Sequence, residues 1–184
     1  MNKRKLVIII LGGLLLSLGG IYLYKTRYHA NHKPNYELIK TVQEKVVVTF
    51  NPPIEFSYDF MTEGVTQHLD RIYTYDYIPE ELQNVILFQG THRIALGTTV
   101  TIHLLAPATI YVFFHELVDS GYTSIFEKLE DWNRCADAPK YDILNGSHGL
   151  NMIMYKTNVK PGIYTIPATT SNEGCFNLAF KFEE

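Results

Sequence analysis

The side chains of this sequence that could do acid–base or metal chemistry are its histidines. They are His29, His32, His68, His92, His103, His115 and His148. No two of them form a His-x-x-x-His pair and no spacing matches a zinc ligand set, so we interpret each as a surface or strand-face residue. His115-Glu116 is the one adjacent pair of base and carboxylate, and a single pair does not make an active site. Because no nucleophile elbow, P-loop or dinucleotide fingerprint is present, the sequence predicts no enzyme and no cofactor.

Carboxylates gather in one stretch of the chain, and calcium is the metal that such a stretch could bind. The residues are Glu127, Glu130, Asp131, Asp137 and Asp142. A calcium ion takes six to eight oxygen ligands, and the three aspartates are the candidates for that role. Their spacing matches no defined calcium loop. The alternative is a solvated helix end followed by a polar loop, and on that interpretation we predict no bound metal.

Aromatic side chains are the candidates for ligand binding. Trp132 is the sole tryptophan, and Tyr122 and Tyr141 are its nearest candidate companions in sequence. Sugar rings stack on exposed aromatic faces while nearby polar groups bind the hydroxyls. The alternative for Trp132 is a packing role at one end of a hydrophobic core.

Two further features concern the cellular compartment. Cys135 and Cys175 are the two cysteines, and a disulfide between them would close about 40 residues and contribute about 3–4 kcal/mol. Such a bond requires an oxidising compartment. Asn145-Gly146-Ser147 is a candidate glycosylation sequon on a turn. Both features agree with a domain outside the cytoplasm.

Composition restricts the class of protein. The 184 residues carry 16 Lys+Arg against 19 Asp+Glu, a net charge of -3. This balance argues against a nucleic-acid partner, which normally requires a basic patch. The 23 Tyr and Phe residues, with many Val and Ile, argue against disorder.

The N-terminus predicts a membrane anchor. Residues 1–5 are a basic flank, and residues 6–24 (LVIIILGGLLLSLGGIYLY) contain no charge. Nineteen residues in a helix span roughly 28 Å, close to the roughly 30 Å of the hydrocarbon layer. A cleaved signal peptide would have a shorter apolar run and an Ala-x-Ala-like end. We expect a single-pass protein whose residues 6–24 bind the lipid bilayer, with its C-terminal domain on the non-cytoplasmic side.

Residues 25–40 are polar and are interpreted as a linker, and residues 41–184 as one domain. In this domain the dominant hydrophobic period is two. Ile54 to Phe60, Thr99 to Leu104 and Phe176 to Phe182 alternate between apolar and polar residues. Further strands are expected at 45–50, 71–77, 85–89, 109–114, 151–157 and 162–166. Short strands separated by turn residues predict an all-β fold, an antiparallel jelly roll or β-sandwich.

One short helix is expected within the domain. Ser124-Ile125-Phe126-Glu127 fits a capping box, which predicts a helix of two or three turns. Its apolar residues would cover one end of the sandwich.

An ordered series of short motifs resembles a known family. It runs from Asp70-Arg71-Ile72-Tyr73 through Pro79–Leu82, a Tyr111-Val112 strand and Leu129–Trp132 to Tyr155-Lys156 and Pro161-Gly162. This series is similar to the jelly-roll, galactose-binding-like accessory domain found beside catalytic modules in secreted polysaccharide-degrading enzymes and in uncharacterised extracellular proteins. The chain departs from that pattern at Asp131, where the family has proline. The resemblance implies the fold and a binding or spacing role.

Two functions therefore stay open. The first is a non-catalytic structural subunit of a larger membrane or virion-like assembly, with other protein subunits as partners. Low charge and many aromatics suit such burial, and no residue set forms an evident ligand site. The alternative is an anchored extracellular domain that binds a glycan or mediates adhesion.

Overall fold

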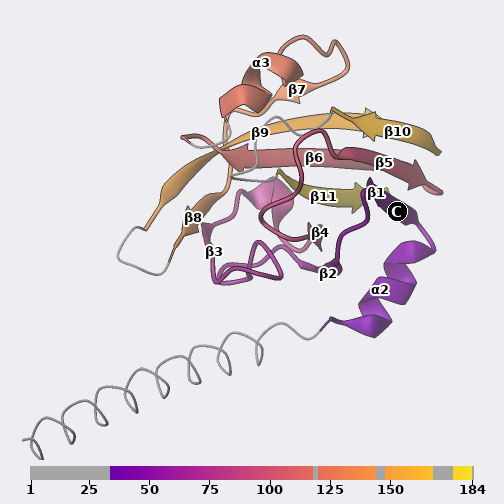
Figure 1. The fold of residues 1–184 in the computed structure, drawn as a ribbon, viewed down its shortest axis with the longest axis horizontal. Coiled ribbons are helices and arrows are strands. Elements are labelled where there is room, and N and C mark those ends of the chain that lie inside the picture. Colours follow the sequence, from indigo (N-terminus) through magenta and orange to yellow (C-terminus); the bar gives the residue numbers. More distant parts are fainter. Residues whose placement is uncertain (1–33, 118–119, 144–147, 168–175, 184) are drawn as a thin grey trace, which may run out of the picture. The chain divides into compact units, whose positions relative to one another are not determined.

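The computed structural model describes residues 34–117, 120–143, 148–167 and 176–183 (Figure 1). All of them belong to one unit, Pro34–Glu184. The predicted flank and anchor, residues 1–24, lie outside the described residues, as does most of the predicted linker. Within the described ranges no helix has the length and apolar character needed to cross a membrane. The membrane anchor therefore stays a prediction.

Strands dominate the described part of the chain. They are β1 (Val46–Asn51), β2 (Ser57–Phe60), β3 (Thr74–Tyr77), β4 (Ile86–Gln89), β5 (Thr99–Leu104), β6 (Ala108–His115), β7 (Asn133–Arg134), β8 (Lys140–Asp142), β9 (Leu150–Val159), β10 (Gly162–Ile166) and β11 (Asn177–Phe182). The helices are α2 (Tyr36–Gln43) and α3 (Thr123–Phe126), with short 3₁₀ turns at Glu80–Leu82 and Ser120–Tyr122.

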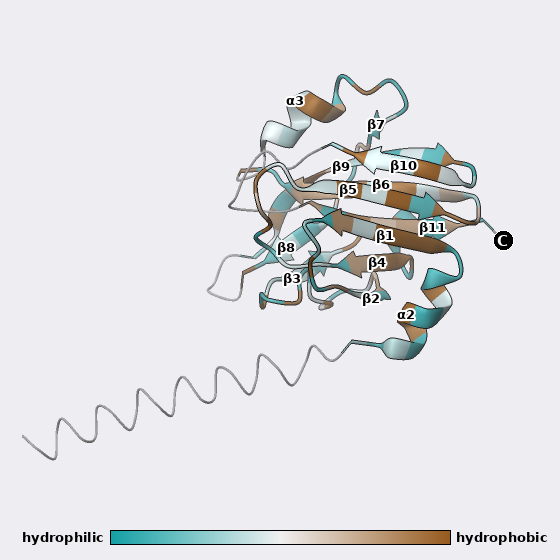
Figure 2. Ribbon diagram, turned by 45° about the vertical axis from the view of Figure 1, so that its right-hand side comes forward, coloured by the Kyte–Doolittle hydropathy of each residue, from teal (hydrophilic) through white to brown (hydrophobic). Residues whose placement is uncertain are grey.

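These strands form two antiparallel sheets, which confirms the predicted all-β sandwich. The small sheet has the order β1-β5-β10, and the large sheet has the order β2-β4-β11-β6-β9-β8-β3 with β7 also paired to β9. Alternate residues of β1 and β5 face the large sheet and are buried, including Val46, Val48, Val100 and Ile102. They pack with Val112 and other residues of β6 and β11 into the main core. Figure 2 shows this alternation of hydrophobic and hydrophilic residues along the strands.

A second core covers the other face of the large sheet. Tyr111 and Phe113 of β6 alternate with the main-core residues and pack with Tyr75 of β3 and Tyr141 of β8. The strands β3 and β8 thus lie over the sheet to which they belong, and the central strands are buried on both faces. One expectation is wrong for this reason. Asn177 and Ala179 are predicted to face solvent, yet both are buried because β11 is a central strand.

The helices differ from the sequence-based expectation. The helix at 123–126 has a single turn instead of two or three, and no side chain caps its N-terminus. Ser124 instead donates its hydroxyl to the carbonyl of Gly121, so the capping box does not form. The other helix, α2, crosses the predicted boundary between linker and domain. Its N-cap is Asn35, whose side chain accepts a hydrogen bond from the Leu38 amide, and its Val42 is buried in the main core.

Candidate functional site

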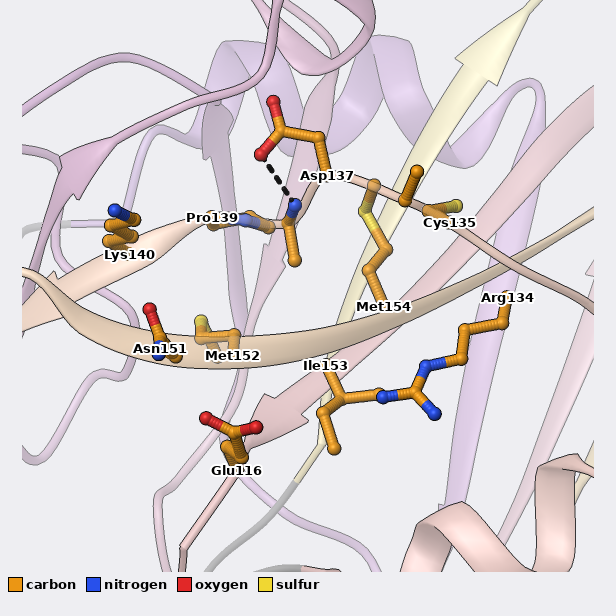
Figure 3. A pocket seen from close by; sticks show the side chains of 12 residues that line it. Glu116, Arg134, Cys135, Asp137, Pro139, Lys140, Asn151, Met152, Ile153 and Met154 are labelled. Atoms are coloured by element: carbon orange, nitrogen blue, oxygen red, sulfur yellow. Dashed lines mark hydrogen bonds between the residues drawn. The ribbon is translucent and has the colours of Figure 1, made fainter.

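A polar groove lies beside β9, in the stretch of that strand between its pairing with β7 and its pairing with β8. The strand β7 pairs with β9 at Lys156 and Tyr155, and β8 pairs with β9 at Asn151 and Leu150. Between these two contacts the Cys135 amide still donates to the Met154 carbonyl, and residues 136–139 then leave β9. The resulting groove has a volume of ≈ 500 Å³ (Figure 3). Met152, Ile153 and Met154 of β9 contribute to its lining and are themselves buried.

Charged and amide side chains surround this groove. They are Glu116, Arg134, Asp137, Lys140 and Asn151, all exposed (Figure 3). An arrangement of carboxylates, cations and an amide can donate and accept hydrogen bonds with a ligand rich in hydroxyl groups.

One exposed aromatic ring adjoins the groove. The Tyr77 side chain is among the exposed large hydrophobics, and its hydroxyl donates to Asp137 Oδ2 over 2.5 Å. The same hydrogen bond is the largest cause of the raised pKa of the Tyr77 hydroxyl. The Lys140 ammonium lies 6.0 Å from the centre of the Tyr77 ring. The groove therefore combines polar groups with one accessible ring.

The three aromatic residues predicted from sequence lie in packed surroundings. Tyr122 is 0% exposed and packs edge-on against Phe176. Tyr141 is 5% exposed and belongs to the second core. Trp132 is half-buried, with its ring edge-on to Phe126 at 5.0 Å, which matches its alternative packing role. The structure does not bring the three together.

The three aspartates predicted as calcium ligands lie in different parts of the structure. Asp137 lines the groove, Asp131 is exposed in the turn after α3, and Asp142 is buried in β8. Asp142 instead lies close to Asp76 and His148. Among the described residues, these three side chains bring atoms that can bind a metal within 4.8 Å of one another. His148 Nδ1 lies 3.0 Å from Asp142 Oδ2 and 3.9 Å from Asp76 Oδ2. This group is an ion pair when His148 is protonated.

A second polar feature, the histidine cluster of His68, His92 and His115, is buried. The three side chains are 1%, 6% and 3% exposed. Their ring centroids are 4.9 Å apart for His68 and His92, 6.0 Å for His92 and His115, and 6.5 Å for His68 and His115. Burial lowers the pKa of His68 well below its usual value, that of His92 to about 4 and that of His115 to about 3. All three rings are therefore neutral at pH 7.

Residues 67–73, which include His68, form a loop between the bridged residues Thr66 and Thr74, and this loop packs against the cluster. Asp70 accepts a hydrogen bond from the His92 amide over 2.6 Å and pairs with Arg71 at 3.1 Å. The Tyr73 ring contacts His92 at 5.3 Å and His115 at 6.2 Å. The Asp70-Arg71-Ile72-Tyr73 motif thus packs against the histidine cluster and is hydrogen-bonded to His92.

The sequence did not predict this cluster. The three rings come from segments far apart in the chain, so no local spacing could indicate their approach. One signal was available: His115 ends a strand whose preceding residues are almost all apolar, which favours burial of that end. His115 and Glu116 are separated accordingly, with His115 buried in the cluster and Glu116 exposed at the groove.

Two expectations fall on residues outside the described ranges. Cys135 is half-buried at the groove, and burial with the nearby Glu81 carboxylate raises the pKa of its thiol to about 11. Its predicted partner Cys175 is not among the described residues, nor is the candidate glycosylation site Asn145. The disulfide and the glycan attachment stay predictions.

Comparison with known proteins supports the fold. No family model matches the chain, and no curated protein is significantly similar to it in sequence. A solved structure, a β-glucuronidase from glycoside hydrolase family 2, is similar over 71% of this chain with a TM-score of 0.53 and 16% identity. The matched region is 14% of that enzyme's chain. The likeness shows a shared fold and agrees with the β-sandwich that the motifs predict.

Proposed function

We propose that this chain is a non-catalytic, membrane-anchored binding domain whose groove between β7, β8 and β9 recognises a saccharide. The observation that carries the proposal is the groove itself, where Asp137, Lys140 and Asn151 stand beside the exposed Tyr77 ring. Carboxylate and amide groups bind sugar hydroxyls, while a tyrosine face covers the apolar side of a sugar ring. An open groove with this lining suits modest affinity and a ligand that extends beyond the contact.

Two further observations support the proposal. One solved structure with a similar fold is a β-glucuronidase of glycoside hydrolase family 2, and the match covers 14% of that enzyme's chain. The adjacent base and carboxylate, His115 and Glu116, are separated into a buried cluster and an exposed groove wall. A general acid–base pair must meet at one substrate, so this separation favours binding without catalysis.

A glycan array tests the proposal. Full-length protein in mild detergent is screened as wild type, Asp137→Ala and Asn151→Ala. Asp131→Ala is the matched control, because Asp131 is an exposed aspartate outside the groove. We expect selective glycan signals from the wild type and the control, and signals lowered at least severalfold by both groove variants. Absence of any wild-type signal, or equal signals from all four proteins, would contradict the proposal.

A second candidate function is a structural subunit of a membrane assembly. The strands β1 and β10 are both edges of the small sheet, since within the described ranges nothing pairs with their outer sides. Val47 and Ile163 are 39% and 71% exposed and flank His103 in one row across this sheet. Open edges and an apolar row suit pairing with another chain.

The native mass of the full-length protein in mild detergent distinguishes the two functions. A large assembly of fixed stoichiometry, dispersed by Ile163→Lys, would support the structural role. A monomer or small oligomer whose mass is unchanged by Ile163→Lys would exclude it.

A further inference from the structure

We propose that His68, His92 and His115 form a binding site for a divalent transition metal of the zinc class. Imidazoles that share one tetrahedral zinc have ring centroids roughly 5 Å apart, because each Zn–N bond is about 2.0–2.1 Å long. The rings of His68 and His92 are at 4.9 Å. His115, whose ring centroid is 6.0 Å from that of His92 and 6.5 Å from that of His68, must approach by about 1–1.5 Å to complete the set.

Hydrogen bonds around the cluster leave ring nitrogens available for a metal. His68 Nε2 and His92 Nδ1 are buried and have no hydrogen-bond partner among the described residues. The other nitrogen of His68 bonds to the Gly90 backbone, and His115 Nε2 lies 2.8 Å from Gln67 Oε1. With Gln67 accepting, His115 Nε2 carries the proton and Nδ1 keeps its lone pair. Histidines that ligate metals donate their second ring nitrogen to such acceptors.

The ligand chemistry selects the kind of metal. Calcium and magnesium require oxygen ligands, whereas the cluster offers three imidazoles. Imidazole ligands suit zinc, copper and nickel. Arg71 and Arg93 place positive charge near His92, and Asp70 is the carboxylate that faces it. The positive charge of the two arginines disfavours cations that imidazole binds weakly, such as Ca²⁺ and Mg²⁺. A metal with high affinity for imidazole is therefore required.

A metal could reach the cluster from the side of the covering loop. The side chains of Arg71 and Asp70 in this loop are 32% and 37% exposed. Hydrogen bonds that hold the loop include those from the Leu69 amide to the Gly90 carbonyl, from the Gln67 amide to the Tyr73 carbonyl and from the His92 amide to the Asp70 carboxylate. Entry from this side requires the Asp70–Tyr73 segment, which lies outside the strands, to release these hydrogen bonds.

The group of Asp76, Asp142 and His148 is the competing site. Its ligand atoms lie closer together, but its His148 side chain is 68% exposed, and Asp76 Oδ2 already accepts a hydrogen bond from the Gly149 amide. The histidine cluster instead contains buried nitrogens that no described residue satisfies. The two sites predict different effects of histidine substitution.

The test uses full-length protein in mild detergent, stripped of metal with a chelator and then titrated with Zn²⁺ or Co²⁺ alone. We expect one metal per chain, a raised thermal midpoint, and Co²⁺ absorption bands of a four- or five-coordinate imidazole site. His92→Gln and His68→Gln should each weaken Co²⁺ binding at least tenfold. The controls His103→Gln, His148→Gln and a His29→Gln/His32→Gln double variant should bind as the wild type does.

A measurement on the wild type keeps the test decisive if a cluster variant fails to fold. Bound Co²⁺ shifts the ring N–H protons of its histidine ligands in proton spectra, and we expect three such signals that persist in His148→Gln. Absence of Co²⁺ binding to the wild type, fewer than three signals, or loss of binding in His148→Gln would each overturn the proposal.

Discussion

The ring of His115 lies flat against the ring of Tyr141, with centroids 3.9 Å apart and planes inclined by 5°. The contact joins the end of β6 to β8, two strands that do not pair with each other directly. The chain neighbours of these residues, Glu116 and Lys140, both line the groove. One stacked pair therefore connects the buried histidine cluster to the walls of the proposed binding site.

Replacement of Tyr141 should destabilise the domain. Removing a buried aromatic ring costs about 3–5 kcal/mol, so we expect Tyr141→Ala to lower the free energy of unfolding by about that amount. Tyr141→Phe keeps the stacked ring, and its loss should stay below about 1.5 kcal/mol. Urea denaturation monitored by circular dichroism measures both. Equal losses in the two variants would show that the ring contact is not the source of stability.

Acid should destabilise the metal-free protein through the histidine cluster. The pKa values of His92 and His115 are lowered to about 4 and about 3, and that of His68 also lies well below 6.5, all chiefly by burial. Above pH 6.5 these rings are neutral in both folded and unfolded chains, so they add no pH dependence. Below pH 6.5 the unfolded chain binds protons that the folded chain does not, and stability falls down to about pH 3, where His115 also becomes protonated in the folded chain.

Arg71, Arg93 and Asp70 also act on His92, and the net effect is the lowered value. The thermal midpoint, measured with a chelator present, should therefore drop steadily between pH 6.5 and 4. In His92→Gln the drop should be shallower. A flat profile over this range in the wild type would contradict the burial of neutral histidines.

The Glu81–Lys156 ion pair should contribute little. Lys156 Nζ lies 2.5 Å from Glu81 Oε2, but the two side chains are 37% and 33% exposed. Solvent screens such pairs, which typically contribute about 0.2–1 kcal/mol. Lys156→Met should thus change the free energy of unfolding by less than about 1 kcal/mol. A loss above about 2 kcal/mol would mean that the pair is structurally essential.

Asn177 is a candidate for stabilising substitution. Its side chain is 2% exposed, and neither its oxygen nor its nitrogen finds a partner among the described residues. A buried unsatisfied polar group costs about 1–3 kcal/mol, so Asn177→Leu, of similar shape, should raise the free energy of unfolding. Asn177→Ala serves as control, since it removes the amide but leaves a cavity. A clear loss of stability in Asn177→Leu would indicate a polar requirement at this position.

The strands of the sandwich core could be predicted from sequence because their signal is local. Alternation in residues 99–104 marks one buried face, and β5 indeed has one face in the core. The two-residue strand β7 and the three-residue strand β8 are too short to show a period. Burial of both faces of β11 depends on strands β3 and β8 lying over the sheet, which no local pattern in residues 176–182 records.

The candidate sites were less predictable than the fold. The groove exists because β7 and β8 pair with separate parts of β9, and its lining comes from three separated stretches of chain. The histidine cluster depends on a contact between Gln67 and His115 across 48 positions. The sequence made Asp137 a calcium candidate, and the structure places it at the groove, where it accepts a hydrogen bond from Tyr77.

Calorimetric titration of the full-length protein with the oligosaccharide that gives the strongest array signal tests the proposed function most directly. Asp137→Ala should raise the dissociation constant at least tenfold, because it removes both a hydroxyl-binding carboxylate and the group that holds Tyr77. Asp131→Ala should bind as the wild type does. Unchanged affinity in Asp137→Ala, or equal weakening in both variants, would place the saccharide outside the groove and contradict the proposal.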